Sequence, residues 1–122
     1  MKNIWLDKPE DHDYPAAQSY LELLYSFEKA ERIADTLKSY CKIITKFKAK
    51  DIFRASQLSL LGVSNSHVSY NLKKMKKGKK LSPLLLVRDN GKLIIADGYH
   101  RLCAAYHKCE DMDVPCKIVD KS

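Results

Sequence analysis

The sequence contains no apolar run long enough to cross a bilayer and no signal peptide. We therefore expect a cytoplasmic protein that has no membrane partner. Its four cysteines form no CxxC pair and no regular framework, so we expect reduced thiols that fill small apolar spaces. An irregularly spaced zinc site remains an alternative, with the ligands Cys103, His107, Cys109 and Cys116.

Acidic side chains are scarce in the C-terminal two thirds of the chain. Residues 1–41 carry 5 basic and 8 acidic side chains, whereas residues 42–122 carry 17 basic and 7 acidic ones. The total of 122 residues is enough for one small domain with an extension, and internal repeats are absent. A basic field of this kind attracts nucleotides, nucleic acid or an acidic partner, and it does not distinguish among them.

Residues 1–42 are predicted to form an N-terminal helical extension. Ile4 and Trp5 are expected to dock its polar arm on the body, and Asp13 is expected to cap the following helix. Apolar residues then recur at helical spacing from residue 16 to residue 41, as one long helix or as two with a break near Ser26. The stripe is wide, which favours packing on the body or on a second copy in a homodimer. The arm also holds the triplet Asp11-His12-Asp13, a weak metal-binding signal.

Residues 43–122 are predicted to form an α+β domain. The strongest signal is Asn90-Gly91, which lies between two apolar runs and is typical of a two-residue hairpin. The predicted elements are a strand over 43–52, a connector over 53–63, a helix capped by Ser64 or Ser66 and ended by Gly78, strands over 84–87 and 93–96, a helix over 98–108 and a last strand over 114–119.

The most informative stretch runs from residue 94 to residue 106, where an apolar run ends in Asp97-Gly98 and a helical pattern begins at once. A helix start presents unpaired N–H groups and a partial positive charge, and glycine lets an anion approach closely. His100 and Arg101 add donors suited to phosphate. We therefore predict a phosphate pocket here. Arg101 is expected to point outward, so that Arg101→Ala leaves the fold intact.

The order of these elements resembles the ParB/sulfiredoxin-like (ParB-like nuclease domain) superfamily over residues 46–119. The resemblance rests on a Ser82-Pro83 strand entry, the hairpin, the segment Asp97-Gly98-Tyr99-His100-Arg101 and a final Val-Pro strand. Free-serine kinases of this fold carry Asp-Gly-His-His-Arg, which is similar at all positions but one. Tyr99 stands where sulfiredoxins have their reactive cysteine and where ParB proteins have an acidic residue.

This resemblance implies a small mixed sheet with packed helices that binds a nucleotide or another phosphorylated ligand. It also implies NTPase, phosphotransfer or nuclease activity, with a nucleoside triphosphate and Mg²⁺ as cofactors. Asp97, His100 and Arg101 are the implied catalytic residues, and Asp97 is the implied group beside the metal. The implied phosphate-binding residues are Ser82, Gly98, Tyr99, His100 and Arg101.

A lysine run supports an alternative function. Six lysines lie within eight residues around Met75 and Gly78, and their mutual repulsion is best offset by a polyanion. The alternative is a non-enzymatic DNA-binding protein of ParB type, associated with a plasmid or mobile element. Its nucleic-acid-binding residues are Lys73, Lys74, Lys76, Lys77, Lys79 and Lys80.

Overall fold

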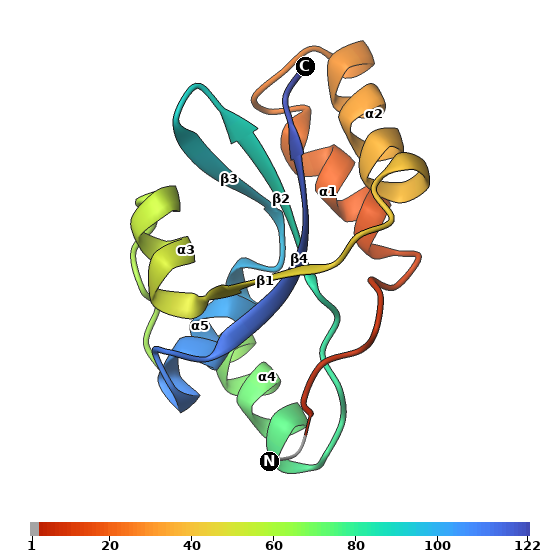
Figure 1. The fold of residues 1–122 in the computed structure, drawn as a ribbon. Coiled ribbons are helices and arrows are strands. Elements are labelled where there is room, and N and C mark those ends of the chain that lie inside the picture. The colour runs from red at the N-terminus through yellow and green to blue at the C-terminus, as the bar shows by residue number, and fades with distance from the viewer. Residues whose placement is uncertain (1–2) are drawn as a thin grey trace.

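A computed structural model describes residues 3–122 as a four-stranded mixed sheet with helices packed on both faces (Figure 1). The strand order is β1-β4-β2-β3, in which β4 and β2 are parallel and the two outer pairings are antiparallel. The predicted α+β class is therefore confirmed. The strands are β1 (Thr45–Lys48), β2 (Leu84–Asp89), β3 (Lys92–Asp97) and β4 (Asp113–Asp120).

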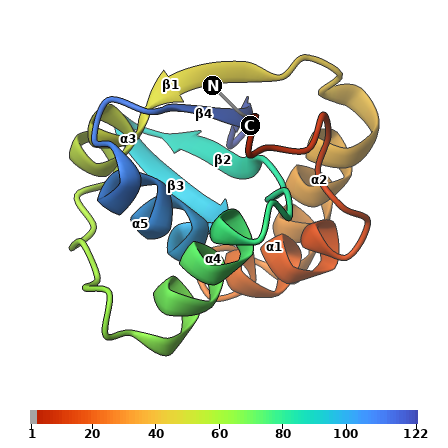
Figure 2. The ribbon, with the colours of Figure 1, turned by 90° about the horizontal axis from the view of Figure 1, so that it is seen from below.

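The helices form two groups around the sheet (Figure 2). One group holds α1 (Asp13–Leu21), α2 (Phe27–Asp35) and a π-helical turn η1 (Thr36–Tyr40), and the other holds α3 (Ala49–Ser56), α4 (Ser66–Lys76) and α5 (Tyr99–Lys108). Within residues 3–122, no helix has the length and apolar content that a bilayer crossing requires.

The central strand β2 explains why both faces are covered. Leu84 and Leu86 pack with α3, α4 and α5, whereas Leu85 and Val87 pack with α1, α2 and η1. A continuous apolar run is typical of a strand buried on both faces. The helices of residues 1–42 thus share a core with the sheet, while the domain division at residue 42 stays a prediction.

The N-terminal segment forms two helices, which is one of the two arrangements that the sequence predicted. Ser26 caps α2 by accepting a hydrogen bond from the Lys29 backbone N–H at 3.2 Å. The break changes the phase of the apolar stripe, so Leu21 and Ile33 are buried while Leu23 is 80% exposed. The polar arm docks as expected, because Trp5 is buried and forms an isolated parallel bridge with Leu81.

The prediction for residues 43–63 was partly wrong. The strand ends at Lys48, and residues 49–56 form α3 rather than strand and connector. Alternation of lysine and apolar residues lasts for only four positions, whereas the buried residues Ala49, Ile52 and Ser56 recur at helical spacing. Further on, the cap of α4 is Asn65, which lies between the two predicted caps and accepts hydrogen bonds from two backbone N–H groups.

The hairpin and the following helix lie where the sequence predicted them. Asn90 and Gly91 have φ values of 50° and 80°, as a two-residue turn between twisted strands requires. β3 then runs back along β2 and passes directly into α5 through Gly98. The chain therefore joins a hairpin turn at one end of β3 to a helix start at the other.

Candidate functional site

A polar pocket of about 490 Å³ lies where β3 ends and α5 begins. Three parts of the chain line it: the β3–α5 junction with Ser82, one face of α4, and the N-terminal arm. All the predicted phosphate-binding residues lie there, although their roles stay predictions. The lining residues are Glu10, His12, Asp13, His67, Tyr70, Asn71, Lys74, Ser82, Asp97, Gly98, Tyr99, His100 and Arg101.

Gly98 sets the geometry of the junction. Its φ of 112° lies in a region that residues with a side chain rarely adopt. A Cβ atom here would lie 2.8 Å from Leu84 Cγ and 3.0 Å from Arg101 Nη2. Glycine is therefore required by the packing of β2 and Arg101 against the junction. Gly98 is also the N-cap of α5, and within residues 3–122 no side chain caps this helix start.

Arg101 points inward, so the expectation of an outward side chain was wrong. Its Nε donates to the Ser82 carbonyl at 2.9 Å, and its Nη2 donates to the Pro83 carbonyl at 3.2 Å and to Asp97 Oδ2 at 3.0 Å. The guanidinium therefore donates to two backbone carbonyls and to a carboxylate one helical turn away, rather than to solvent alone. Arg101 ties the entry of β2 to the start of α5.

The carboxylates of the pocket are held by different partners. Burial raises the pKa of Asp97, and the nearby Asp13 carboxylate adds to this rise, while Arg101 opposes it. Asp13 is buried, and its Oδ2 accepts a hydrogen bond from the Glu10 backbone N–H at 3.0 Å. Asp13 was predicted as a helix cap, but it is the first residue of α1, and His12 occupies the cap position.

His12 lies beside the two carboxylates of the arm. Its Nε2 lies 3.3 Å from Glu10 Oε2 and 3.4 Å from Asp13 Oδ1. Asp97 thus pairs with Arg101, and His12 contacts the two carboxylates of the arm. Among the described residues that line the pocket, those on the other side, from α4 and the first turn of α5, include no carboxylate.

That second side carries a histidine pair and a lysine. The rings of His67 and His100 are 4.7 Å apart between centroids. Lys74 lies two turns further along the same face of α4, with Nζ 5.7 Å from the centroid of the Tyr70 ring. Burial, together with repulsion from His67, lowers the pKa of His100.

Tyr99 is held by the loop that precedes α4. Its hydroxyl donates a hydrogen bond to the Ser59 carbonyl, and His107 Nε2 lies 2.8 Å from the Leu61 carbonyl oxygen. Burial raises the pKa of the Tyr99 phenol. Tyr99 therefore anchors a loop beside the pocket, with its ring 5.5 Å from that of His100.

The lysine run divides between the pocket and the surface. Lys74 is half-buried and lines the pocket, whereas the other five side chains are exposed at the end of α4 and in the loop before Leu81. These five are Lys73, Lys76, Lys77, Lys79 and Lys80.

The structure does not bring together the candidate ligands of the alternative metal sites. Within residues 3–122, no group of three or more His, Cys, Asp or Glu side chains is arranged to hold a metal ion. Cys103 and Cys116 are buried in the core, whereas Cys109 is exposed, so the irregular spacing does not converge on one point. Asp97 and the adjacent Asp13 are the pocket carboxylates that would have to hold Mg²⁺ if it entered together with a nucleotide.

Sequence reasoning missed the contribution of α4 and the arm. A signal was present on α4, because His67, Tyr70 or Asn71, and Lys74 repeat at three- and four-residue spacing and so share one face. The arm offered only the triplet Asp11-His12-Asp13, in which His12 and Asp13 do reach the pocket.

Comparison with known proteins gives no match to any family model, curated protein or solved structure.

Proposed function

We propose that the chain is a ParB/sulfiredoxin-like protein that binds a nucleotide or another phosphate ester at the start of α5. The observation that carries this proposal is the convergence of His67, His100 and Lys74 on a helix start without a side-chain cap. The order strand, helix, helix, hairpin, helix, strand from β1 to β4 supports the family assignment.

The phosphate group lies against the first backbone N–H groups of α5, where the helix dipole favours negative charge. His67 and His100 donate from one side, and Lys74 neutralises charge from the same face. Arg101 acts mainly by fixing Asp97 and the Ser82 carbonyl in place. Magnesium, when bound with a nucleotide at Asp97, supplies further neutralisation of phosphate charge.

The same residues give the proposed chemistry of an NTPase or phosphotransfer enzyme. Asp97 has a raised pKa and lies within the pocket, so it is placed to orient an attacking hydroxyl or water. His100 stabilises charge that develops on the transferred phosphoryl group. Arg101 serves as a positioning residue for Asp97.

Thermal stabilisation by ligands tests the binding proposal. The ligands are ATP, CTP, GTP and pyrophosphate, each with and without Mg²⁺, and the variants are His100→Gln and Lys74→Gln. Lys76→Gln is the matched control, because it removes the same charge from the same helix at an exposed position outside the pocket. We expect at least one ligand to raise the melting temperature, and the two pocket variants to lose that rise while the control keeps it.

Two outcomes contradict the proposal: no phosphate ligand stabilises the protein, or Lys76→Gln weakens binding as much as Lys74→Gln does. Release of inorganic phosphate from a stabilising nucleotide, lost in Asp97→Asn, distinguishes an enzyme from a binding protein.

A second candidate function is DNA binding by the exposed lysines. The favouring observation is Tyr70, which precedes the lysine run on α4, is 62% exposed beside Lys74 and offers a surface for base stacking. Duplex DNA binding that weakens steeply with salt, falls in the paired variant Lys76→Gln/Lys77→Gln and survives His100→Gln supports this function. Unchanged DNA binding in the paired variant refutes it.

We also propose a homodimer. Its interface lies at the corner between α1 and α2 rather than along one apolar helix stripe. Leu23, Leu24 and Phe27 are 80%, 48% and 58% exposed there. Sedimentation is expected to show a dimer that Phe27→Glu dissociates; a monomer in the unaltered protein refutes it.

A further inference from the structure

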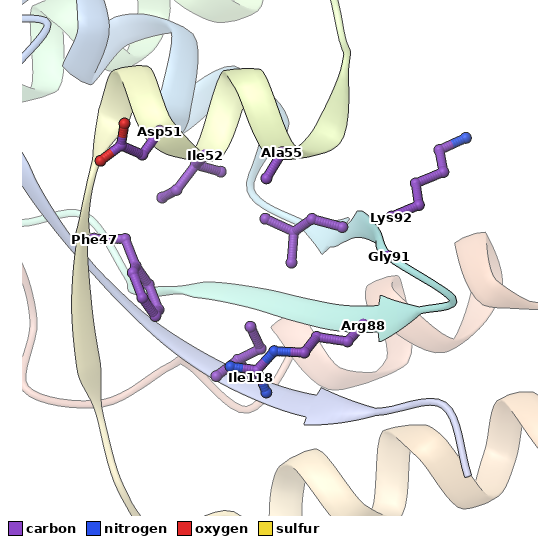
Figure 3. A pocket seen from close by; sticks show the side chains of 9 residues that line it. Phe47, Asp51, Ile52, Ala55, Arg88, Gly91, Lys92 and Ile118 are labelled. Atoms are coloured by element: carbon purple, nitrogen blue, oxygen red, sulfur yellow. The ribbon is translucent and has the colours of Figure 1, made fainter.

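An apolar cleft of about 330 Å³ opens at the opposite end of the β2–β3 hairpin, between α3 and the face of the sheet (Figure 3). Its floor and walls are formed by residues from all four strands and from α3. Among the helices of residues 3–122, α3 alone contributes residues to its lining. The lining residues are Phe47, Asp51, Ile52, Ala55, Arg88, Gly91, Lys92, Leu93 and Ile118.

Arg88 interrupts the apolar floor. It continues the side of β2 on which Leu84 and Leu86 are buried, so the pattern would place an apolar residue at this position. Figure 3 shows its guanidinium lying across the sheet beside Ile118, on the side toward Phe47. A cation therefore lies within a surface that is otherwise apolar.

The guanidinium is weakly neutralised within the protein. Among residues 3–122 its ion-pair partner is Asp120, at 3.7 Å, and both side chains are more than half exposed. An exposed pair of this length contributes little, and it leaves most of the guanidinium's donors available. Arg88 can thus accept a second carboxylate in a bidentate arrangement without breaking a strong bond.

The other charged residues of the cleft do not compete for this role. Figure 3 shows the Lys92 ammonium extending away from the cleft, and the Asp51 carboxylate turned away from Arg88. Asp51 has its own partner, Arg54, at 3.6 Å. The cleft therefore presents one inward-facing cation and apolar walls, which is the arrangement expected for an amphipathic anion.

We propose that this cleft binds a small monocarboxylic acid with an apolar body. The carboxylate pairs with Arg88, and the apolar body lies on Leu93 and Ile118 beneath Ile52 and Ala55. The cleft lies at the other end of β3 from the polar pocket and shares no lining residue with it. The proposal is thus independent of phosphate binding at α5.

Titration of the ¹⁵N-labelled full chain with octanoate and, separately, with octanol tests the proposal. Octanol has the same apolar chain and lacks the charge. We expect octanoate to shift the amide signals of Leu93, Ile118 and Ala55, and to bind about tenfold or more tightly than octanol. Arg88→Gln is expected to remove this preference, leaving the two affinities within about twofold.

Two further variants serve as controls. Lys92→Gln removes the same charge from a side chain that points away from the cleft, so the preference for octanoate is expected to persist. Ala55→Trp fills the cleft from an exposed helix position and is expected to abolish binding of both probes. Absence of octanoate binding, equal affinity for octanoate and octanol, or an equal effect of Lys92→Gln and Arg88→Gln each overturns the proposal.

Discussion

The two ends of the β2–β3 hairpin carry different kinds of pocket, one polar and one largely apolar. At the α5 end, Arg101 is held by two carbonyls and Asp97, and the polar pocket is organised before any ligand arrives. At the turn end, Arg88 has one weak partner and apolar neighbours. The two arginines therefore differ in how many of their N–H donors already have partners within the protein. Arg101 builds structure, whereas Arg88 is free to bind.

The largest effect is expected at the junction glycine. Gly98→Ala adds a Cβ atom 2.8 Å from Leu84 Cγ at a φ of 112°, so overpacking and backbone strain both act. We expect a loss of about 2–4 kcal/mol in the free energy of unfolding, measured by urea denaturation. Gly91→Ala is the control, because its φ is also positive and nothing lies within 4 Å of the new atom. Its expected cost is about 1 kcal/mol. Equal costs for the two variants would show that packing at the α5 end is no tighter than at the turn.

The next effect separates the two arginines directly. Arg101→Ala leaves the Ser82 and Pro83 carbonyls without their donor, and it leaves Asp97 without its counter-charge. We expect a loss of about 2 kcal/mol in the free energy of unfolding. Arg88→Ala is expected to cost less than about 0.5 kcal/mol, because its ion pair is exposed. Parallel thermal and urea denaturation of both variants checks this. If Arg88→Ala is the more destabilising, the assigned roles are reversed.

The pH dependence of stability tests the environment of His100 in the polar pocket. The folded-state pKa of His100 lies below the unfolded value of 6.5, so the unfolded chain takes up this proton first as pH falls. Stability contributed by neutral His100 is therefore full above pH 6.5 and is lost as pH falls below it. Comparing the unaltered protein with His100→Gln by denaturation at several pH values isolates this contribution. A steeper acid decline in the variant than in the unaltered protein contradicts the assignment.

An effect smaller than those of Gly98→Ala and Arg101→Ala is expected outside both sites. The Tyr25 hydroxyl donates to Asp89 Oδ2 at 2.6 Å, next to the hairpin turn, and burial with this hydrogen bond raises the pKa of Tyr25 to about 12. Tyr25→Phe removes one hydrogen bond and is expected to cost about 1 kcal/mol in urea denaturation. The polar pocket lies at the far end of β3, so phosphate affinity is expected to stay unchanged. A change in that affinity would mean that the two ends of the hairpin are coupled.

The regular elements were predictable where local chemistry determines them. Asn90-Gly91 specified the hairpin, Gly98 marked the start of α5, and the run Leu84–Val87 indicated a buried strand. Residues 49–56 were misassigned because β1 passes into α3 without a glycine or proline between them. That boundary depends on tertiary contacts, since the Ala49 N–H donates to the Met112 carbonyl at 2.9 Å.

Only those site residues that lie close together in the sequence could be predicted. The β3–α5 junction is one continuous segment, so its residues were found together. The direction of Arg101 depends on carbonyls 18 and 19 residues earlier in the sequence, which no local pattern contains. The apolar cleft had no sequence signal, because Phe47, Arg88 and Ile118 come from three separate strands.

Phosphate binding at the start of α5 is tested by the pKa of His100, measured by NMR with and without a saturating phosphate ligand. The ligand is the one that gives the largest thermal stabilisation. In the free protein, burial and His67 hold this pKa below 6.5. A bound phosphate beside the imidazole favours its charged form, so the pKa is expected to rise on binding, with tighter binding at pH 6 than at pH 8. A His100 pKa that stays unchanged while the ligand is bound would contradict the placement of phosphate at the start of α5.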